Sequence, residues 1–296
     1  MTLIELVDAT ARQLDAAAVC FGHGTGNAFD EAAWLVLWRL GLPLDSALLA
    51  DLALASSVPT AQQREEVAVL LSRRIGTRKP LAYLTREAWL QGVSFYVDER
   101  VIVPRSLIAE VLCNGTIAPW LEGDEPRILD LCTGGASLAV LAALNYPDSA
   151  VDAADISPDA LAVAAINVAR HDLGRRITLI ASDGLSALRG PYDLIICNPP
   201  YVNADSMARL PPEYQAEPAL ALDGNRLGGD DGMDFIRQLL RETPRHLSEQ
   251  GVLVLEIGNE RAHFEAAFGQ IDAIWLETSA GADQVLLLER GALLKC

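Results

Sequence analysis

The most constraining feature of this chain is a run of alternating strand and helix patterns that begins at Arg127. Residues 128–132 form a short apolar stretch, and a helical pattern follows over residues 137–144. Further strand patterns occupy residues 150–154 and 177–181, with a helical segment between them. Strands that alternate with helices are typical of a parallel sheet covered by helices. The sequence therefore predicts an α/β fold here.

Small residues and an acid follow the first two strands. Thr133, Gly134, Gly135 and Ala136 come after the first strand, where a helix start offers free N–H groups and small side chains admit a ligand. Asp155 ends the second strand, where an acid can accept both ribose hydroxyls of a nucleoside. Tight packing of the glycines and a solvated acid are the alternatives. Loop, acid and spacing together favour a nucleoside site.

The tetrapeptide Asn198-Pro199-Pro200-Tyr201 follows another apolar run, residues 193–197. Two prolines fix φ and remove two backbone donors, so the local carbonyls are left as acceptors. A planar NH₂ group fits such a site, with one hydrogen on the Asn198 oxygen, one on a carbonyl, and the Tyr201 ring over the plane. The alternative is an ordinary turn after a strand.

These candidate residues belong to one edge of the predicted sheet. Ligands of open α/β sheets bind outside the carboxyl ends of the strands. Gly134, Asp155 and Asn198 fall at such ends, as does Asp183, which either accepts an adenine amino group or closes a turn. We therefore expect Asn198 to face the nucleoside ligand.

Composition excludes several classes of protein. With 296 residues, 51% of them hydrophobic, the chain can bury a large core. A net charge of −17 opposes binding to a phosphate backbone and suits a basic protein partner. Five dispersed cysteines without a Cys-x-x-Cys pair predict neither disulfides nor a metal site. No stretch has transmembrane length and no basic secretory start is present, so a cytoplasmic location is expected.

The first 85 residues carry helical patterns. Apolar residues recur at helical spacing over residues 3–19, 29–40 and 47–55. Thr60 and Gln63 have the spacing of a capping box, which predicts a helix that runs to about Arg74. We expect a small helical domain over residues 1–85.

Over residues 92–104 the apolar side chains alternate with others at a period of two, which is typical of a β-strand. Phe95, Val97, Val101 and Val103 share one face of a predicted β-hairpin, with Asp98-Glu99 as its turn. The hairpin is expected to be a linker over residues 86–106, and residues 107–296 to form the second domain.

The motifs resemble those of a known enzyme family. Residues 130–136, Asp155-Ile156-Ser157 and Asn198-Pro199-Pro200-Tyr201 are similar to the class I methyltransferases, which use S-adenosylmethionine on a Rossmann-like, mostly parallel sheet. The chain resembles the protein-glutamine methyltransferases throughout, most closely the branch that acts on large-subunit ribosomal protein three. Further matching stretches are residues 79–84, 95–106, 217–222 and 256–259.

The resemblance implies a role for each part. The helical domain would recognise a basic protein substrate, large-subunit ribosomal protein three, with no direct DNA or membrane partner and an oligomeric state left open. The implied cofactor-binding residues are Asp130, Cys132, Thr133, Gly134, Gly135, Ala136, Asp155, Ile156, Asp183, Gly184 and Asn198. The implied substrate-binding residues are Asn198, Pro199, Pro200, Tyr201, Phe95, Pro104, Arg105 and Glu110, with Asn198, Pro199 and Tyr201 as the catalytic ones. The alternative for Arg105 is a structural pair with an acid.

The chain departs from the family pattern at four positions, three in this loop and one at Gly184. The family usually has glycine at Cys132 and Ala136 and a small polar residue at Gly135, so a modest loss of cofactor affinity is expected. A bulky residue is common at Gly184, so the adenine is expected to be less enclosed.

Other functions remain open from the sequence. The same family also methylates glutamine in peptide chain release factors. An adenine-amino DNA methyltransferase can use the tetrapeptide but needs a basic groove. A nicotinamide-dependent dehydrogenase shares the strand, glycine turn and acid, yet the loop lacks Gly-x-Gly-x-x-Gly. A chain that no longer binds cofactor and serves as a ribosomal-protein binding module is the non-catalytic alternative.

Overall fold

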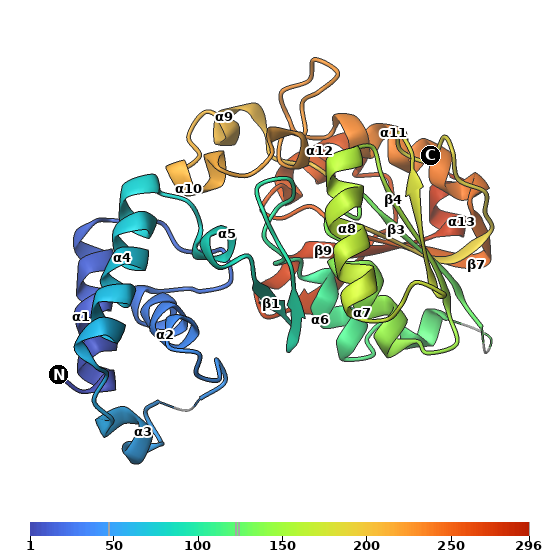
Figure 1. Cartoon of the computed structure of the whole chain (residues 1–296). Helices are drawn as coiled ribbons and strands as arrows, with labels where there is room; N and C mark the ends of the chain where they lie inside the picture. Colours follow the sequence, from blue (N-terminus) through green and yellow to red (C-terminus); the bar gives the residue numbers. More distant parts are fainter. Residues whose placement is uncertain (47, 122, 124, 296) are drawn as a thin grey trace. The chain divides into compact units, whose positions relative to one another are not determined.

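The computed structural model describes residues 1–46, 48–121, 123 and 125–295, and its chain divides into two compact units. The first, here called the helical unit, contains Met1–Glu87 and Pro211–Ala216. The second, the α/β unit, contains Ala88–Leu210 and Glu217–Cys296. No sequence pattern had assigned Pro211–Ala216 to the helical part. Figure 1 shows the elements of each unit.

The helical unit contains the predicted helices with small changes of length. Its helices are α1 (Leu3–Ala16), α2 (Ala28–Arg39), α3 (Leu52–Ser56), α4 (Ala61–Thr77), α5 (Leu81–Thr85) and α10 (Pro212–Gln215). The Thr60 capping box is present, with Gln63 as its partner. The segment predicted as a helix over 47–55 is helical only in α3, because the Asp51 side chain accepts a hydrogen bond from Leu54 N (2.9 Å) and starts the helix there. Residue 47 lies outside the described residues.

A buried ion cluster lies inside the helical unit. Arg74 of α4 is fully buried, and its guanidinium contacts Glu31 of α2 (2.7 Å) and Glu213 of α10 (3.3 Å). Arg78 also contacts Glu213 (2.8 Å). Glu213 therefore attaches the Pro211–Ala216 segment to the helices by charge.

The predicted hairpin exists, but its turn is earlier than expected. Strands β1 (Ala88–Leu90) and β2 (Val93–Phe95) pair antiparallel, with Leu90 opposite Val93. Gln91 and Gly92 form the turn, both with positive φ as tight hairpins require. The predicted turn at Asp98-Glu99 is present, with Val101 N donating to the Asp98 carbonyl (3.1 Å), but it lies outside the hairpin, and the Asp98 carboxylate pairs with Arg100 (2.7 and 2.8 Å). That pair bends the chain without a strand on either side.

The α/β unit contains the predicted mostly parallel sheet. Seven strands lie in the order β5-β4-β3-β6-β7-β9-β8, and β9 alone runs antiparallel to its neighbours β7 and β8. The strands are β3 (Arg127–Leu131), β4 (Ala150–Asp155), β5 (Ile177–Ala181), β6 (Tyr192–Cys197), β7 (Leu247–Glu256), β8 (Ile274–Thr278) and β9 (Gly281–Glu289). The chain order reverses between β3 and β6, which is where open α/β sheets bind ligands.

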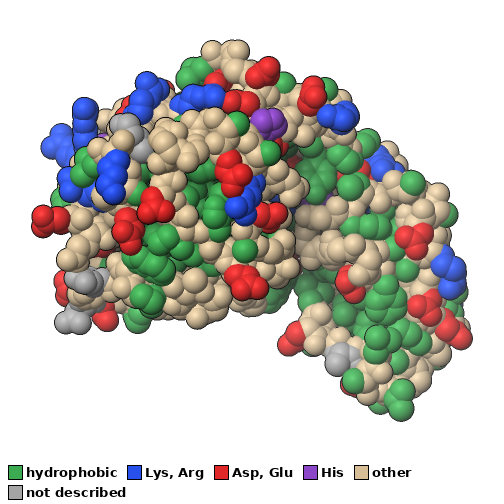
Figure 2. Space-filling view, turned by 180° about the vertical axis from the view of Figure 1, so that it is seen from behind, with side chains coloured by type: hydrophobic (Ala, Val, Ile, Leu, Met, Phe, Trp, Pro, Cys, Tyr) green, Lys and Arg blue, Asp and Glu red, His purple; other side chains and the backbone are tan. Residues whose placement is uncertain are grey.

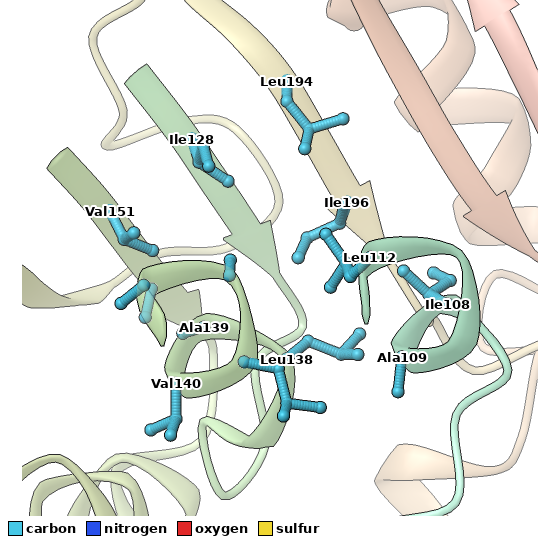
Figure 3. Close-up of a cluster of buried hydrophobic side chains, with 14 of the residues drawn as sticks. Ile108, Ala109, Leu112, Ile128, Leu138, Ala139, Val140, Val151, Leu194 and Ile196 are labelled. Carbon is cyan, nitrogen blue, oxygen red and sulfur yellow. The ribbon is translucent and has the colours of Figure 1, made fainter. Parts of the chain in front are cut away.

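Helices cover both faces of the sheet. They are α6 (Ile108–Cys113), α7 (Ser137–Asn145), α8 (Pro158–Arg170), α9 (Ala204–Met207), α11 (Asp234–Glu242), α12 (Arg261–Phe268) and α13 (Arg290–Leu293), with 3₁₀ turns η1 (Ala118–Trp120), η2 (Ala219–Ala221) and η3 (Thr243–Arg245). Strand side chains alternate between two cores. Ile128 and Ile196 pack with Leu112 of α6 and Leu138 of α7 on one face (Figure 3). Leu129 faces the opposite side of the sheet, where it packs in a second core with residues of α11, α12 and α13.

The described part of the chain contains no candidate membrane-spanning helix. None of its helices combines the length and the apolar composition needed to cross a bilayer.

Candidate functional site

The glycine loop after β3 holds an unusual backbone. Cys132, Gly134 and Ala136 all have positive φ, between 54° and 62°. Left-handed backbone favours glycine and costs other residues roughly 1–2 kcal/mol. Cys132 and Ala136 thus adopt, with some strain, a backbone conformation that glycine adopts freely. The loop is fixed by a hydrogen bond from Thr133 N to the carbonyl of Ala154 (2.9 Å).

Asp130 lies beneath this loop and is only 1% exposed. Its Oδ2 accepts hydrogen bonds from Thr133 Oγ1 (2.5 Å) and Ala139 N (2.9 Å). Burial raises the pKa of Asp130 to about 7, against the lowering by those two donors. Its Oδ1 has no hydrogen-bond partner among the residues the structure describes. The loop therefore covers a carboxyl group with unused acceptor capacity.

Asp155, at the end of β4, connects the loop to the next helix. Its two oxygens accept hydrogen bonds from Gly134 N and Ser157 N, each at 2.9 Å. Burial raises its pKa, while these backbone donors lower it. Each carboxylate oxygen has a second lone pair, so Asp155 can still accept ligand hydroxyls.

A cavity of about 770 Å³, partly open to solvent, lies at the carboxyl ends of β3 to β6. The structure brings together eight predicted residues from four separate strand ends. They are Cys132, Gly134, Asp155, Ile156, Asp183, Gly184, Asn198 and Pro200.

Sequence analysis missed the residues that close the cavity. Those lining it are Arg100, Val101, Ile102, Leu131, Ala154, Ser157, Ala160, Ser182, Pro218, Leu220, Ala221, Arg226 and Phe235. Pro218, Leu220 and Ala221 belong to the stretch 217–222, and the resemblance of that stretch to the family could have indicated that these residues lie at the site. Phe235 of α11 lies near Gly184, since a Cβ built on that glycine would be 3.8 Å from Cε2 of Phe235. Phe235 thus lines the cavity next to Gly184, where the side chain of a bulky residue at position 184 would otherwise lie.

Four predicted cofactor residues do not line the cavity. Asp130, Thr133, Gly135 and Ala136 form the inner side of the loop instead. The buried side chain of Asn167, on α8, holds that side. It donates to the carbonyl of Gly135 (2.8 Å) and exchanges hydrogen bonds with the backbone of Tyr96 (2.7 and 3.0 Å). Asn167 was not recognised from the sequence.

The tetrapeptide follows β6, as predicted. Asn198 is half-buried and lines the cavity, and its side chain has no hydrogen-bond partner in the described part of the chain. Pro199 and Pro200 are buried. The Tyr201 hydroxyl is 3.5 Å from Oε1 of Glu256. The Asn198 amide is therefore available to a ligand.

The other predicted substrate residues lie away from the cavity. Phe95 is fully buried in the core, beside the His171 ring. Pro104 is also buried. Arg105 forms a two-pronged ion pair with Glu217 (2.6 and 2.7 Å), which was the structural alternative for this residue. Glu110 accepts hydrogen bonds from the backbone and hydroxyl of Ser279.

Known proteins resemble this chain over its whole length. The ribosomal protein uL3 glutamine methyltransferase of Bordetella pertussis is 51% identical over 295 residues, covering 99% of this chain and 96% of the relative. Proteins of the same name from Burkholderia pseudomallei and Neisseria meningitidis serogroup B are 48% and 46% identical, covering 99% of this chain and 95% and 94% of theirs. The chain belongs to this glutamine methyltransferase family. Membership confirms the resemblance that the motifs carried.

Two further comparisons concern the fold. The Methyltransferase small domain family matches residues 116–210. The solved hMettl16 catalytic domain, in complex with the MAT2A 3'UTR hairpin 6, is 13% identical with a TM-score of 0.50, covering 78% of this chain and 81% of that one. Such a likeness concerns the fold alone, and it agrees with the predicted class I methyltransferase architecture. The chain is thus a methyltransferase by family and by fold.

Proposed function

We propose that this chain transfers a methyl group from S-adenosylmethionine to the side-chain amide nitrogen of a glutamine in ribosomal protein uL3. The observation that carries the proposal is the free Asn198 amide in the wall of the cavity at the carboxyl ends of the strands. The relatives' name supplies the acceptor protein.

The residues around the cavity fit the cofactor. Asp155 would accept the ribose hydroxyls, and the exposed Asp183 would accept the adenine amino group. Ile156 and Phe235 offer apolar walls for the adenine ring. When bound, the cofactor supplies an electrophilic methyl group on a sulfonium.

Asn198 and Pro199 would activate the acceptor by geometry. An amide nitrogen is a poor nucleophile because its lone pair is delocalised into the carbonyl. If the Asn198 side-chain oxygen and the Pro199 carbonyl accept the two N–H groups, the nitrogen is held in line with the methyl group. The same acceptors stabilise the positive charge that develops on nitrogen. The nitrogen then loses its proton to solvent.

The helical unit is proposed as the part that recognises the protein substrate. Large aliphatic side chains are exposed around α3, with Leu49, Leu52 and Val58 each more than two-thirds exposed. Figure 2 shows hydrophobic side chains gathered on the surface of this unit. Together with a net charge of −17, such a surface suits a basic protein with apolar side chains of its own.

The test is methyl transfer to purified uL3, followed by mass spectrometry of its glutamines. We expect one methyl group on a glutamine side chain, and turnover roughly two or more orders of magnitude lower for Asn198→Ala, with cofactor affinity little changed. Asn114→Ala, an exposed asparagine on a turn after α6, is the matched control and should keep wild-type turnover.

The same assay separates the competing functions. Methyl transfer to a release factor and not to uL3 would move the chain to the other branch, and transfer to DNA alone would favour an adenine acceptor. Calorimetry with S-adenosylmethionine that detects no binding would leave only the non-catalytic module.

A further inference from the structure

A buried glutamate stands next to the tetrapeptide and has no role in the mechanism above. Glu256 is the last residue of β7, which pairs with β6 so that Leu255 is opposite Cys197. Glu256 therefore lies at the same sheet edge as Asn198. It is only 5% exposed, and the charge of Arg105 acts on it and lowers its pKa, against the raising by burial.

One oxygen of Glu256 is occupied by the start of α6. Oε2 accepts hydrogen bonds from Ser106 Oγ (2.5 Å) and Leu107 N (2.9 Å), with Ile108 N at 3.5 Å. The other oxygen, Oε1, has the Tyr201 hydroxyl at 3.5 Å. This distance is at the long limit of a hydrogen bond, so the contact gains strength if the tyrosine moves slightly closer.

The tyrosine ring is confined from its other side by glycine. A Cβ on Gly258 would lie 2.6 Å from Cε2 of Tyr201, closer than two such atoms can approach. A Cβ on Gly232 would lie 2.1 Å from the Tyr201 carbonyl oxygen. The ring and the backbone of Tyr201 are therefore each in close contact with a glycine, and the hydroxyl lies beside the buried Glu256 carboxylate.

We propose that Glu256 is a positioning residue for methyl transfer, which fixes the plane of the Tyr201 ring through the tyrosine hydroxyl. The inference rests on the proposed function, in which that ring covers the acceptor amide. Hydrogen bonds to an ionised acceptor are about twice as strong as neutral ones and gain further where water is excluded. A carboxylate here holds the ring better than a neutral side chain, while Gly258 leaves the ring the space it needs.

The test is a double-mutant cycle of Glu256→Gln and Tyr201→Phe, measured as single-turnover methyl transfer to uL3. Loss of a hydrogen bond to a charged partner predicts that Glu256→Gln lowers the transfer rate about tenfold. In the Tyr201→Phe background the same change should cost less than about twofold, because the hydroxyl is already absent. Affinity for S-adenosylmethionine, by calorimetry, should stay at the wild-type value in all three variants.

Two controls separate positioning from stability. Ser106→Ala removes the partner of Oε2 and leaves Tyr201 in place, so it should retain most of the transfer rate. Gly258→Ala leaves Glu256 intact but displaces the ring, and it should lower the transfer rate without loss of cofactor binding. Additive effects of Glu256→Gln and Tyr201→Phe, or a Ser106→Ala loss equal to that of Glu256→Gln, would overturn the inference. Failure of the wild-type chain to methylate uL3 would instead overturn the proposed function.

Discussion

Two buried carboxylates of the helical unit and two at the ligand edge of the α/β unit are held in opposite ways. In the helical unit, Glu31 and Glu213 are at most 2% exposed and share the guanidinium of Arg74. In the α/β unit, Asp130 and Glu256 are at most 5% exposed, and their hydrogen bonds come from hydroxyl and backbone groups.

The pKa values of Glu213, Asp130 and Glu256 are shifted in different directions. Burial pushes the pKa of Glu213 upward, but the Cys20 N–H, Arg78 and Arg74 outweigh it and the net shift is downward. Burial dominates at Asp130 and Glu256 and raises the pKa of both. A charge that is compensated where it is buried holds a fold together. Carboxyl groups left partly uncompensated at the ligand edge of a sheet are typical of functional sites.

The largest expected effect is on the helical unit. Arg74→Met leaves Glu31 and Glu213 buried without a cation, which should lower the free energy of unfolding by about 3–5 kcal/mol. Chemical denaturation measures it. Arg39→Met is the matched control, because Arg39 pairs with Glu66 (3.1 Å) at the surface and its loss should cost at most about 1 kcal/mol. Equal losses would mean that the buried carboxylates do not depend on the Arg74 charge for stability.

Asp130→Asn tests the uncompensated carboxyl. With its pKa raised to about 7, folded Asp130 keeps its proton between about pH 4 and pH 7, where the unfolded chain has lost it. The wild type should therefore lose stability relative to Asp130→Asn as pH rises through this window, by up to about 4 kcal/mol. Denaturation at several pH values measures the difference. Parallel pH dependence of the two proteins would mean that folded Asp130 is ionised throughout.

Asp155→Ala tests whether a carboxylate at the cavity binds ligand. Removal of the charged acceptor for the ribose hydroxyls should weaken S-adenosylmethionine binding by roughly 1–3 kcal/mol. Calorimetry measures it, and no dinucleotide should bind to the wild type. Asp159→Ala, an exposed acid in the first turn of α8, is the control and should bind normally. An unchanged affinity for Asp155→Ala would refute the ribose assignment.

The smallest effect is expected for Tyr201→Phe, which keeps the ring that covers the amide. Its loss of turnover should stay near tenfold, the scale of one hydrogen bond, whereas Tyr201→Ala should lose more. Single-turnover assays compare the two. Equal losses would assign the role to the hydroxyl and not to the ring.

The sequence by itself determined the strands β3 to β6, the Thr60 capping box and the polar residues at the strand ends. These features depend on local periodicity, on caps a few residues apart and on the restricted φ of proline, all of which act within one segment. Family motifs then added the cofactor and the reaction, because the spacing of loop, acid and tetrapeptide is a property of the chain alone.

Only the tertiary structure decided which distant groups meet. Arg105 finds Glu217, 112 residues later, and Ser106 finds Glu256, 150 residues later. Phe95 is buried in the core, the hairpin turns at Gln91-Gly92, and Phe235 lies beside Gly184. Such contacts depend on how elements pack, and no local pattern encodes a partner more than a hundred residues away.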